Sequence, residues 1–267
     1  MIIFENEFFS LQHKISFTPL NETFEPHIHE EWEFFYLVEG DVYFVIDGIK
    51  YNLKKNSLIF IKPATIHNII INSNAIYERY VIHLDENAFS KTIIDLFKEV
   101  PLINENDDFI PSFNNLLLNL NSLDEESKNI AIKDLLELYA IKNKITINYE
   151  DNTNKNYKST FANIIDFIDE NIESKIDVNL IKEKFFVSSS WISHVFKENT
   201  GLSFINYVNT KKIVHAQTLL NKGLSPLEVS NICSYEYYST FYRQYKQYYQ
   251  MPPRKSNNVK PSSNLII

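Results

Sequence analysis

The chain has 267 residues, of which 44% are hydrophobic and 22% are charged, and its formal net charge is -8. This composition is typical of folded globular proteins and excludes a disordered chain, and the length suits two domains. No apolar run approaches the ~20 residues that are needed to span a bilayer. The single cysteine, Cys233, excludes an intrachain disulfide and a cysteine-based zinc site. The first residues show no basic segment followed by an apolar core, so we expect no signal peptide and a cytoplasmic protein.

Charge is distributed unevenly along the chain. Residues 1–156 hold 13 basic and 25 acidic side chains, a balance of -12, whereas residues 180–267 hold 11 basic and 4 acidic ones, a balance of +7. This asymmetry favours an acidic sensing half joined to a basic half that binds nucleic acid. Chance scatter of charge is the alternative interpretation.

The first 84 residues contain short runs rich in Phe, Tyr, Ile and Val, separated by turn residues. Asp47-Gly48 between two such runs is a strong signal for a two-residue hairpin. Many short strands at this spacing predict a small antiparallel barrel or jelly roll. The expected strands cover 14–20, 33–39, 41–47, 50–53, 57–61, 66–72 and 76–84.

Histidines and a glutamate recur within this region, in PHIHEEWEFFYLVEG and in PATIH. Strand alternation places His27 and His29 on one face, which in a barrel interior can converge with Glu33 and His67. Three imidazoles and a carboxylate can bind a divalent transition metal. The two segments resemble the first cupin motif and a shortened second one, which implies a cupin-like barrel over 1–84. We interpret these four residues as ligand-binding, and contacts to an organic effector, a metal site and a packing role all remain open.

Residues 85–147 change to a helical period, with expected helices at 87–100, 113–123 and 125–145. The last two are predicted to form an antiparallel pair. Such a pair can cover the barrel, and a second apolar stripe can also mediate dimerisation through Leu116, Leu120, Leu135 and Leu138. Residues 148–158 are polar and lack periodicity, which indicates a linker.

Residues 159–257 are predicted to form an all-α DNA-binding domain, followed by a disordered tail at 258–267. Capping residues indicate helix starts at Ser159, Asp177 and Ser188, and Pro226 suits a first helical turn. Two copies of a short helix, a turn and a second helix flank one long helix at 204–221. This arrangement predicts two helix-turn-helix units and therefore a DNA-binding function.

The second helix of each unit carries the predicted DNA contacts. Their outward faces offer small, hydroxyl-bearing and basic side chains, which suit phosphates and base edges in a major groove. We expect the second unit to make the clear base contact and the first to rely more on shape and phosphate. The predicted contacts are Ser189, Ser190, Ser193, His194 and Lys197 in the first unit, and Tyr238, Ser239, Tyr242, Arg243 and Lys246 in the second.

Three segments, SSSWISHVFKENTGLSFINYV, KKIVHAQTLL and SYEYYSTFYRQYKQYYQMPP, resemble the AraC/XylS family of transcription regulators. The resemblance covers about 90 residues and implies two readers in one chain that enter successive major-groove segments on one face of the DNA. By position it assigns Arg243 to the usual arginine of the second reader, which can bond guanine in a bidentate manner. The chain departs from the family pattern where glycine is usual, at Phe186, Ser234 and Gln250.

These observations predict a cytoplasmic, non-enzymatic regulator that binds double-stranded promoter DNA and responds to a small-molecule effector, with no cofactor and no membrane partner. A homodimer is expected, and RNA polymerase is a further candidate partner. Two alternatives remain at this point. One is a metal-dependent cupin enzyme with an accessory DNA-binding domain, and the other is an interaction adaptor that no longer reads DNA.

Overall fold

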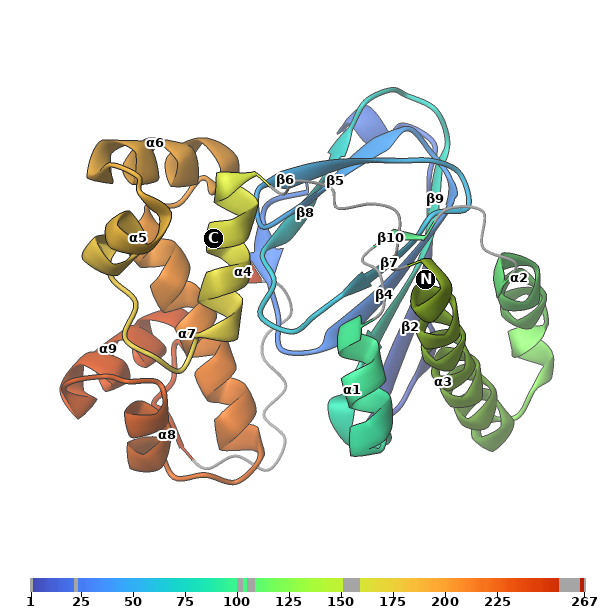
Figure 1. The fold of residues 1–267 in the computed structure, drawn as a ribbon. Helices are drawn as coiled ribbons and strands as arrows, with labels where there is room; N and C mark the ends of the chain where they lie inside the picture. Colours follow the sequence, from blue (N-terminus) through green and yellow to red (C-terminus); the bar gives the residue numbers. More distant parts are fainter. Residues whose placement is uncertain are drawn as a thin grey trace.

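The computed structural model describes residues 2–21, 24–99, 103–104, 109–150, 159–254 and 265–266, arranged as a β domain with associated helices and an all-α domain (Figure 1). This is the predicted α+β two-domain class. Figure 1 shows the strands between two groups of helices: α1, α2 and α3 on one side, and α4 to α9 on the other.

The β domain consists of two antiparallel sheets that together form the predicted barrel. One sheet has the strand order β1-β2-β9-β4-β7-β10 and the other has the order β11-β3-β8-β5-β6. The strands are β1 Ile2–Glu5, β2 Phe9–Ser16, β3 His27–Ile28, β4 Trp32–Glu39, β5 Val42–Ile46, β6 Ile49–Leu53, β7 Leu58–Ile61, β8 His67–Ile71, β9 Tyr77–Leu84, β10 Ile103–Asn104 and β11 Leu265–Ile266.

Strand β4 shows why the barrel sequence is apolar on both faces. Trp32, Phe34 and Tyr36 point to one side and pack against the helices, whereas Phe35 and Leu37 point into the space between the sheets. The helices α1 (Lys91–Glu99), α2 (Phe109–Asn119) and α3 (Glu125–Glu150) contribute to the first of these clusters. They therefore cover the outer face of the six-stranded sheet.

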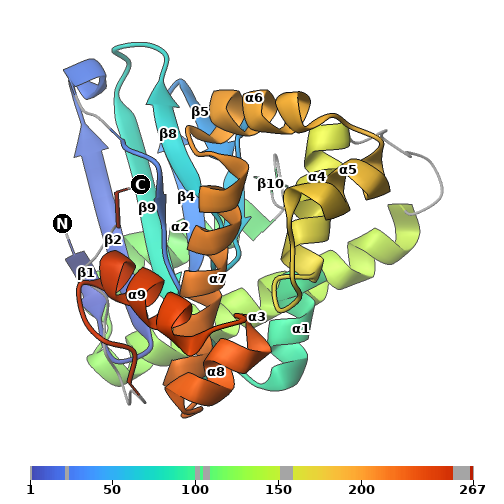
Figure 2. The ribbon, with the colours of Figure 1, turned by 90° about the vertical axis from the view of Figure 1, so that its left-hand side faces the viewer.

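The all-α domain begins each predicted helix at a local cap. Ser159, Asp177 and Ser188 each accept a backbone N–H bond from the first turn, and Ser225 forms a capping box with Glu228. The helices are α4 Thr160–Glu170, α5 Val178–Phe185, α6 Ser189–Thr200, α7 Phe204–Asn221, α8 Pro226–Ile232 and α9 Tyr238–Tyr249. Figures 1 and 2 show α7 running between the unit of α5 and α6 and the unit of α8 and α9.

Several boundaries differ from those expected. β2 starts at Phe9 instead of residue 14, because Phe9 and Leu11 are core residues whereas Phe17 and Leu20 are exposed. α3 continues through Glu150 into the predicted linker, and residues 151–158 of that linker lie outside the described residues. In the predicted disordered tail, Leu265–Ile266 pairs with β3, and the rest of the tail lies outside the described residues.

The two domains meet at the turn between β5 and β6. Asp47 and Gly48 both have positive φ, as the predicted hairpin turn requires. A Cβ atom on Gly48 would lie 2.7 Å from the Cβ of Asn199 in α6, so the glycine allows this close approach. Asp47 is buried and accepts hydrogen bonds from Tyr207 Oη at 2.7 Å and from Lys211 Nζ at 3.1 Å. Both donors lie on α7, so the hairpin is fixed to the central helix of the other domain.

Candidate functional site

The second helix of each helix-turn-helix unit, α6 and α9, presents the predicted DNA contacts to solvent. Ile192 and Phe196 of α6, and Phe241 and Tyr245 of α9, are buried and fix each helix against its neighbours. The ten predicted side chains are all exposed: Ser189, Ser190, Ser193, His194, Lys197, Tyr238, Ser239, Tyr242, Arg243 and Lys246. The faces that remain free are therefore the ones with hydrogen-bonding groups.

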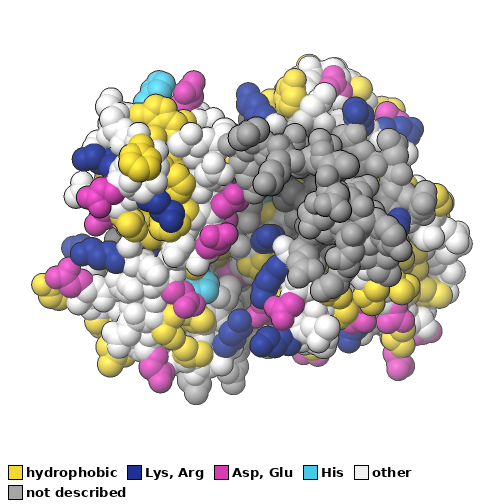
Figure 3. All heavy atoms as spheres, viewed as in Figure 1, with side chains coloured by type: hydrophobic (Ala, Val, Ile, Leu, Met, Phe, Trp, Pro, Cys, Tyr) yellow, Lys and Arg dark blue, Asp and Glu magenta, His cyan; other side chains and the backbone are white. Residues whose placement is uncertain are grey.

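Charge on these faces is mixed. His194 Nε2 lies 3.3 Å from Glu198 on α6, and Lys197 Nζ donates to the carbonyl of Gly201 at 2.7 Å. Within the described part of the chain, no ion pair is formed by Arg243. On the face drawn in Figure 3, basic and acidic side chains alternate over the α domain. Arg243 is thus a cation that remains available to an incoming base or phosphate.

Three turns of this domain adopt the left-handed backbone conformation that glycine favours, although none of them has glycine at that position. Phe186, Ser234 and Gln250 have φ values of 55°, 56° and 57°. These are the positions where the family pattern carries glycine, the residue that adopts the left-handed conformation most easily. The substitutions therefore leave the helix-turn-helix geometry in place.

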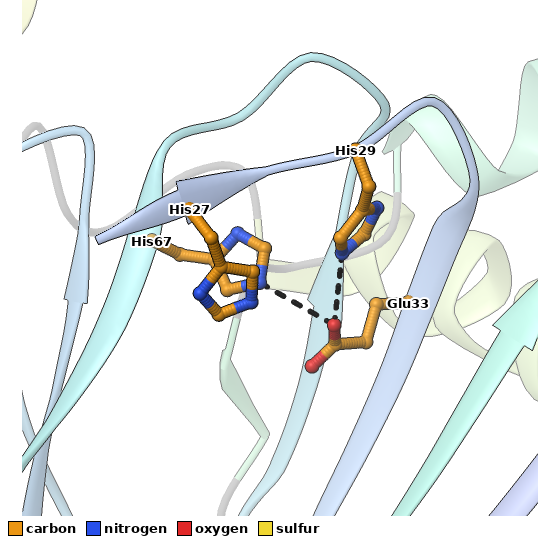
Figure 4. A group of neighbouring side chains, drawn as sticks. All are labelled: His27, His29, Glu33 and His67. Atoms are coloured by element: carbon orange, nitrogen blue, oxygen red, sulfur yellow. Dashed lines mark hydrogen bonds and ion pairs between the residues drawn. The ribbon is translucent and has the colours of Figure 1, made fainter. Parts of the chain in front are cut away.

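A second cluster of polar side chains lies inside the barrel, where the four predicted ligand residues meet (Figure 4). Glu33 comes from β4, His67 from β8, and His27 and His29 from the short β3 segment and its end. The possible ligand atoms of these residues all lie within 4.8 Å of one another. The sequence prediction that these residues converge is confirmed.

Glu33 is the centre of this cluster. Its Oε2 atom lies 3.0 Å from His29 Nε2 and 3.3 Å from His67 Nε2. His83 Nε2 approaches the same oxygen at 3.3 Å. Glu33, His29 and His67 are buried, and Phe44 stacks on the ring of His67 with the two ring centroids 5.9 Å apart.

His83 is a member of the cluster that the sequence analysis missed. It lies directly opposite Glu33 in the pairing of β4 with β9. Its signal in the sequence is the alternation along β9, since Tyr77 and Val81 also point between the sheets. The sequence shows the alternation along β9, but it does not show that β9 pairs with β4.

Burial and neighbouring charge shift the pKa values in and beside this cluster. Burial would raise the pKa of Glu33, but the charges and hydrogen bonds of His67, His29 and His83 hold it well below its usual range. Burial would lower the pKa of His29, but Glu33 raises it. Burial and the charge of His67 lower the pKa of His27 to about 4. Burial raises the pKa of Glu30 to about 8.

The four leucines predicted for dimerisation do not share one exposed face. Leu120 is fully buried in the core and Leu116 and Leu135 pack partly against it, whereas Leu138 is 60% exposed. The prediction is wrong for Leu120, because this residue begins the short 3-10 segment Leu120–Ser122 after α2 and its side chain is buried in the core. The exposed apolar side chains of α3 are Ile130, Leu138 and Ile141.

Two family models match the chain. The AraC-like ligand binding domain matches residues 15–138, and a helix-turn-helix domain matches residues 182–258. The chain belongs to the AraC family. It is therefore a DNA-binding transcription regulator with a ligand-binding domain, in a family that is not enzymatic. Across the residues that the structure describes, no helix is long and apolar enough to cross a membrane.

The sequence relatives match about a third of the chain each. The transcriptional regulatory protein HptR of Staphylococcus aureus is 26% identical over 98 residues, which are 36% of this chain and 39% of HptR. The multiple antibiotic resistance protein MarA of Salmonella typhimurium is 28% identical over 97 residues, which are 36% of this chain and 76% of MarA. A crystal structure of apo ToxT from Vibrio cholerae aligns over 94% of this chain and 97% of its own, with 12% identity and a TM-score of 0.42.

Proposed function

We propose that this AraC-family protein recognises a specific promoter sequence in double-stranded DNA under the control of a small effector held in the barrel. The observation that carries the proposal is the pair of recognition helices, α6 and α9, with ten exposed polar side chains. Serine and tyrosine hydroxyls and lysines suit phosphate contacts, and Arg243 suits a guanine edge. The effector site of this proposal is the group of His27, His29, Glu33 and His67.

We further propose that the working form is a homodimer, with RNA polymerase as a partner at the promoter. The exposed apolar face of α3, with Ile130, Leu138 and Ile141, supports the homodimer. A contact between copies would remove these side chains from water. This face of α3 belongs to a different element from the recognition helices α6 and α9 and from Glu33 and His67 of the barrel.

The test of the DNA assignment is the substitution Arg243→Ala. A duplex is first selected from random sequence with the purified protein, and affinities are then measured by mobility shift at one fixed salt concentration. Loss of a bidentate base contact should cost about 1–3 kcal/mol and relax the preference at one base pair. Lys246→Ala is the matched control, because loss of a phosphate contact weakens all sequences alike and reduces the salt dependence.

The same measurements distinguish a DNA-binding regulator from an interaction adaptor. An adaptor that does not read DNA would select no duplex, and neither substitution would change its weak, salt-sensitive binding. An Arg243→Ala variant with unchanged affinity and unchanged base preference would refute the assignment of this residue while leaving the other contacts to be tested singly.

A further inference from the structure

We propose that Lys212, His215 and Ser234 fix the distance and the angle between the recognition helices α6 and α9, and thereby set the number of base pairs that the protein accepts between its two half-sites. These three are positioning residues, because they act on DNA through the two helices. With their partners they form the inter-unit junction, which comprises Glu173, Ser174, Lys212, His215, Cys233 and Ser234. The proposal rests on the proposed function, since it concerns a protein that reads DNA with both units.

The two helix-turn-helix units have separate hydrophobic cores. Phe196 of α6 and Tyr207 of α7 belong to one core, which also includes residues of α4 and α5. Leu220 of α7 and Phe241 of α9 belong to the other, which also includes residues of α8. The partly buried ring of Tyr248 packs against both. Packing within one core does not orient the other, so the angle between α6 and α9 depends on α7 and on contacts that cross from unit to unit.

Lys212 makes such a crossing contact. Its Nζ donates to the carbonyl of Ser174 at 2.7 Å and to the carbonyl of Cys233 at 2.8 Å. Ser174 lies in the turn between α4 and α5, whereas Cys233 is the residue at which α8 ends. Burial lowers the pKa of Lys212, and the amine has N–H donors for both carbonyls in either charge state. Lys212 is 6% exposed, so water competes little for these bonds.

Ser234 adds a bond that glycine could not make. Its Oγ donates to the carbonyl of Glu173 at 2.6 Å, while its φ of 56° keeps the left-handed turn. This is one of the positions where the family pattern carries glycine. His215 of α7 contacts the side chain of the same glutamate, with Nε2 at 2.9 Å from Oε1. Two successive carbonyls of the α4–α5 turn are thus bound from α7 and from the turn of the second unit.

A fixed angle between α6 and α9 corresponds to a fixed number of base pairs. B-DNA completes one turn in about 10–10.5 base pairs, so one added base pair moves a half-site by about 3.4 Å and rotates it by about 34°. Two helices that are joined firmly cannot both follow this movement unless bonds of the junction break. We therefore expect strong selection for one spacing in the native chain and weaker selection once the junction is cut.

Binding to duplexes of altered spacing tests the proposal. The half-sites of the selected duplex are located by single substitutions, and one base pair is then added or removed between them. For the native full-length chain, each change should weaken binding at least tenfold in a mobility shift at fixed salt, as the loss of one base contact does. Ser234→Gly keeps the left-handed turn and should reduce this spacing penalty at least threefold, as expected for one hydrogen bond. Lys212→Met should reduce it further. The penalty is a ratio of two affinities of one variant, so a general loss of stability does not change it.

Two controls remove bonds that do not join the units. Gln250 also has a left-handed conformation, at φ 57°, but it donates to the carbonyl of Gln247 in its own helix. Thr218 donates to the carbonyl of His215 within α7. Gln250→Gly and Thr218→Val should therefore keep the native spacing penalty, and so should Lys212→Arg, which retains donors for both carbonyls. A native chain that binds all three spacings alike, an unchanged penalty in Ser234→Gly and Lys212→Met, or an equal change in the controls would overturn the proposal.

The distance between two spin labels reports on the junction without DNA. Glu183→Cys in α5 and Gln247→Cys in α9 place the labels at exposed positions outside the predicted DNA contacts. The native Cys233 is buried, and burial raises its pKa to about 11, so it reacts little with the label. One label then lies in each unit.

We expect one narrow distribution of label distances in the native chain and a distribution about twofold broader in Ser234→Gly and Lys212→Met. Gln250→Gly should leave the width unchanged. Equal widths in all variants would show that the junction does not hold the units together. A protein that selects no duplex contradicts the proposed function, and the label distances then decide the junction alone.

Discussion

Phe186 holds a left-handed backbone conformation at φ 55°, and its side chain is 94% exposed. For a residue with a Cβ atom this conformation costs about 1–2 kcal/mol, and the exposed ring recovers little of that by packing. Ser234 and Gln250 share the conformation but gain hydrogen bonds, from Ser234 Oγ to the carbonyl of Glu173 and from Gln250 Nε2 to that of Gln247. Of these three residues, Phe186 therefore has the fewest interactions that offset the cost of its left-handed conformation.

We predict that Phe186→Gly stabilises the DNA-binding domain. Relief of the left-handed strain, less the greater freedom of glycine in the unfolded chain, should raise the free energy of unfolding by about 1 kcal/mol. Urea denaturation of the full chain, followed by circular dichroism, measures this difference. Phe186→Ala keeps the Cβ atom and should not show the gain. A glycine variant no more stable than the alanine variant would show that the turn stores no such strain.

At the level of single residues, the sequence predicted those site residues whose positions depend on spacing within a short segment. His27, His29, Glu33 and His67 were identified from two short segments, and these residues converge in the structure. His83 was not predicted, because its place opposite Glu33 depends on the long-range pairing of β4 with β9. Leu120 was assigned to an exposed stripe, but helical spacing alone does not tell which of two apolar faces meets the sheet.

Helix α7 is the element to which the β5–β6 hairpin is fixed. Lys211 is 2% exposed and lies between Asp47 at 3.1 Å and Asp169 at 2.5 Å. Burial alone would lower the pKa of Lys211, but the two carboxylates outweigh it and raise the pKa. The lysine is therefore charged at neutral pH, and its removal would leave two carboxylates without their cation.

We predict that Lys211→Met lowers the free energy of unfolding by about 3–5 kcal/mol at pH 8, since breaking a buried ion pair leaves unpaired charge behind. The loss should be smaller at pH 5, because burial raises the pKa of Asp169, which takes up protons as the pH falls and then needs no cation. Urea denaturation at both pH values measures the two losses. Lys222→Met, which breaks the more exposed pair with Glu86, should cost less than about 1 kcal/mol. Equal losses for the two lysines would contradict this account.

Among whole elements, helices were predicted more accurately than strands. Helix α7 has the predicted bounds, and Ser159, Asp177 and Ser188 cap α4, α5 and α6 as expected, because a cap depends only on its own first turn. Strands β1, β10 and β11 are short and exist only through their partners, so no pattern within two to four residues indicated them.

At the scale of the whole molecule, the outer face of α3 exposes apolar side chains to solvent in the single chain. Ile130, Leu138 and Ile141 are 51%, 60% and 41% exposed, and helical spacing places them on one side. The opposite side, with Ile132, Leu136 and Tyr139, packs on the six-stranded sheet. Covering the exposed side with a second copy would bury apolar surface, and the two α domains would then be able to read neighbouring DNA segments.

We therefore predict that Leu138→Asp weakens self-association at least tenfold, because it places a charge in the contact between two copies of α3. Sedimentation equilibrium over a range of protein concentrations measures the change. The side chain is exposed in the single chain, so the free energy of unfolding should change little, and denaturation at low concentration checks this. Leu227→Asp is the matched control, because Leu227 on α8 is 59% exposed but lies in the other domain. Unchanged association in Leu138→Asp, or an equal loss in both variants, would show that copies of this chain meet through another surface.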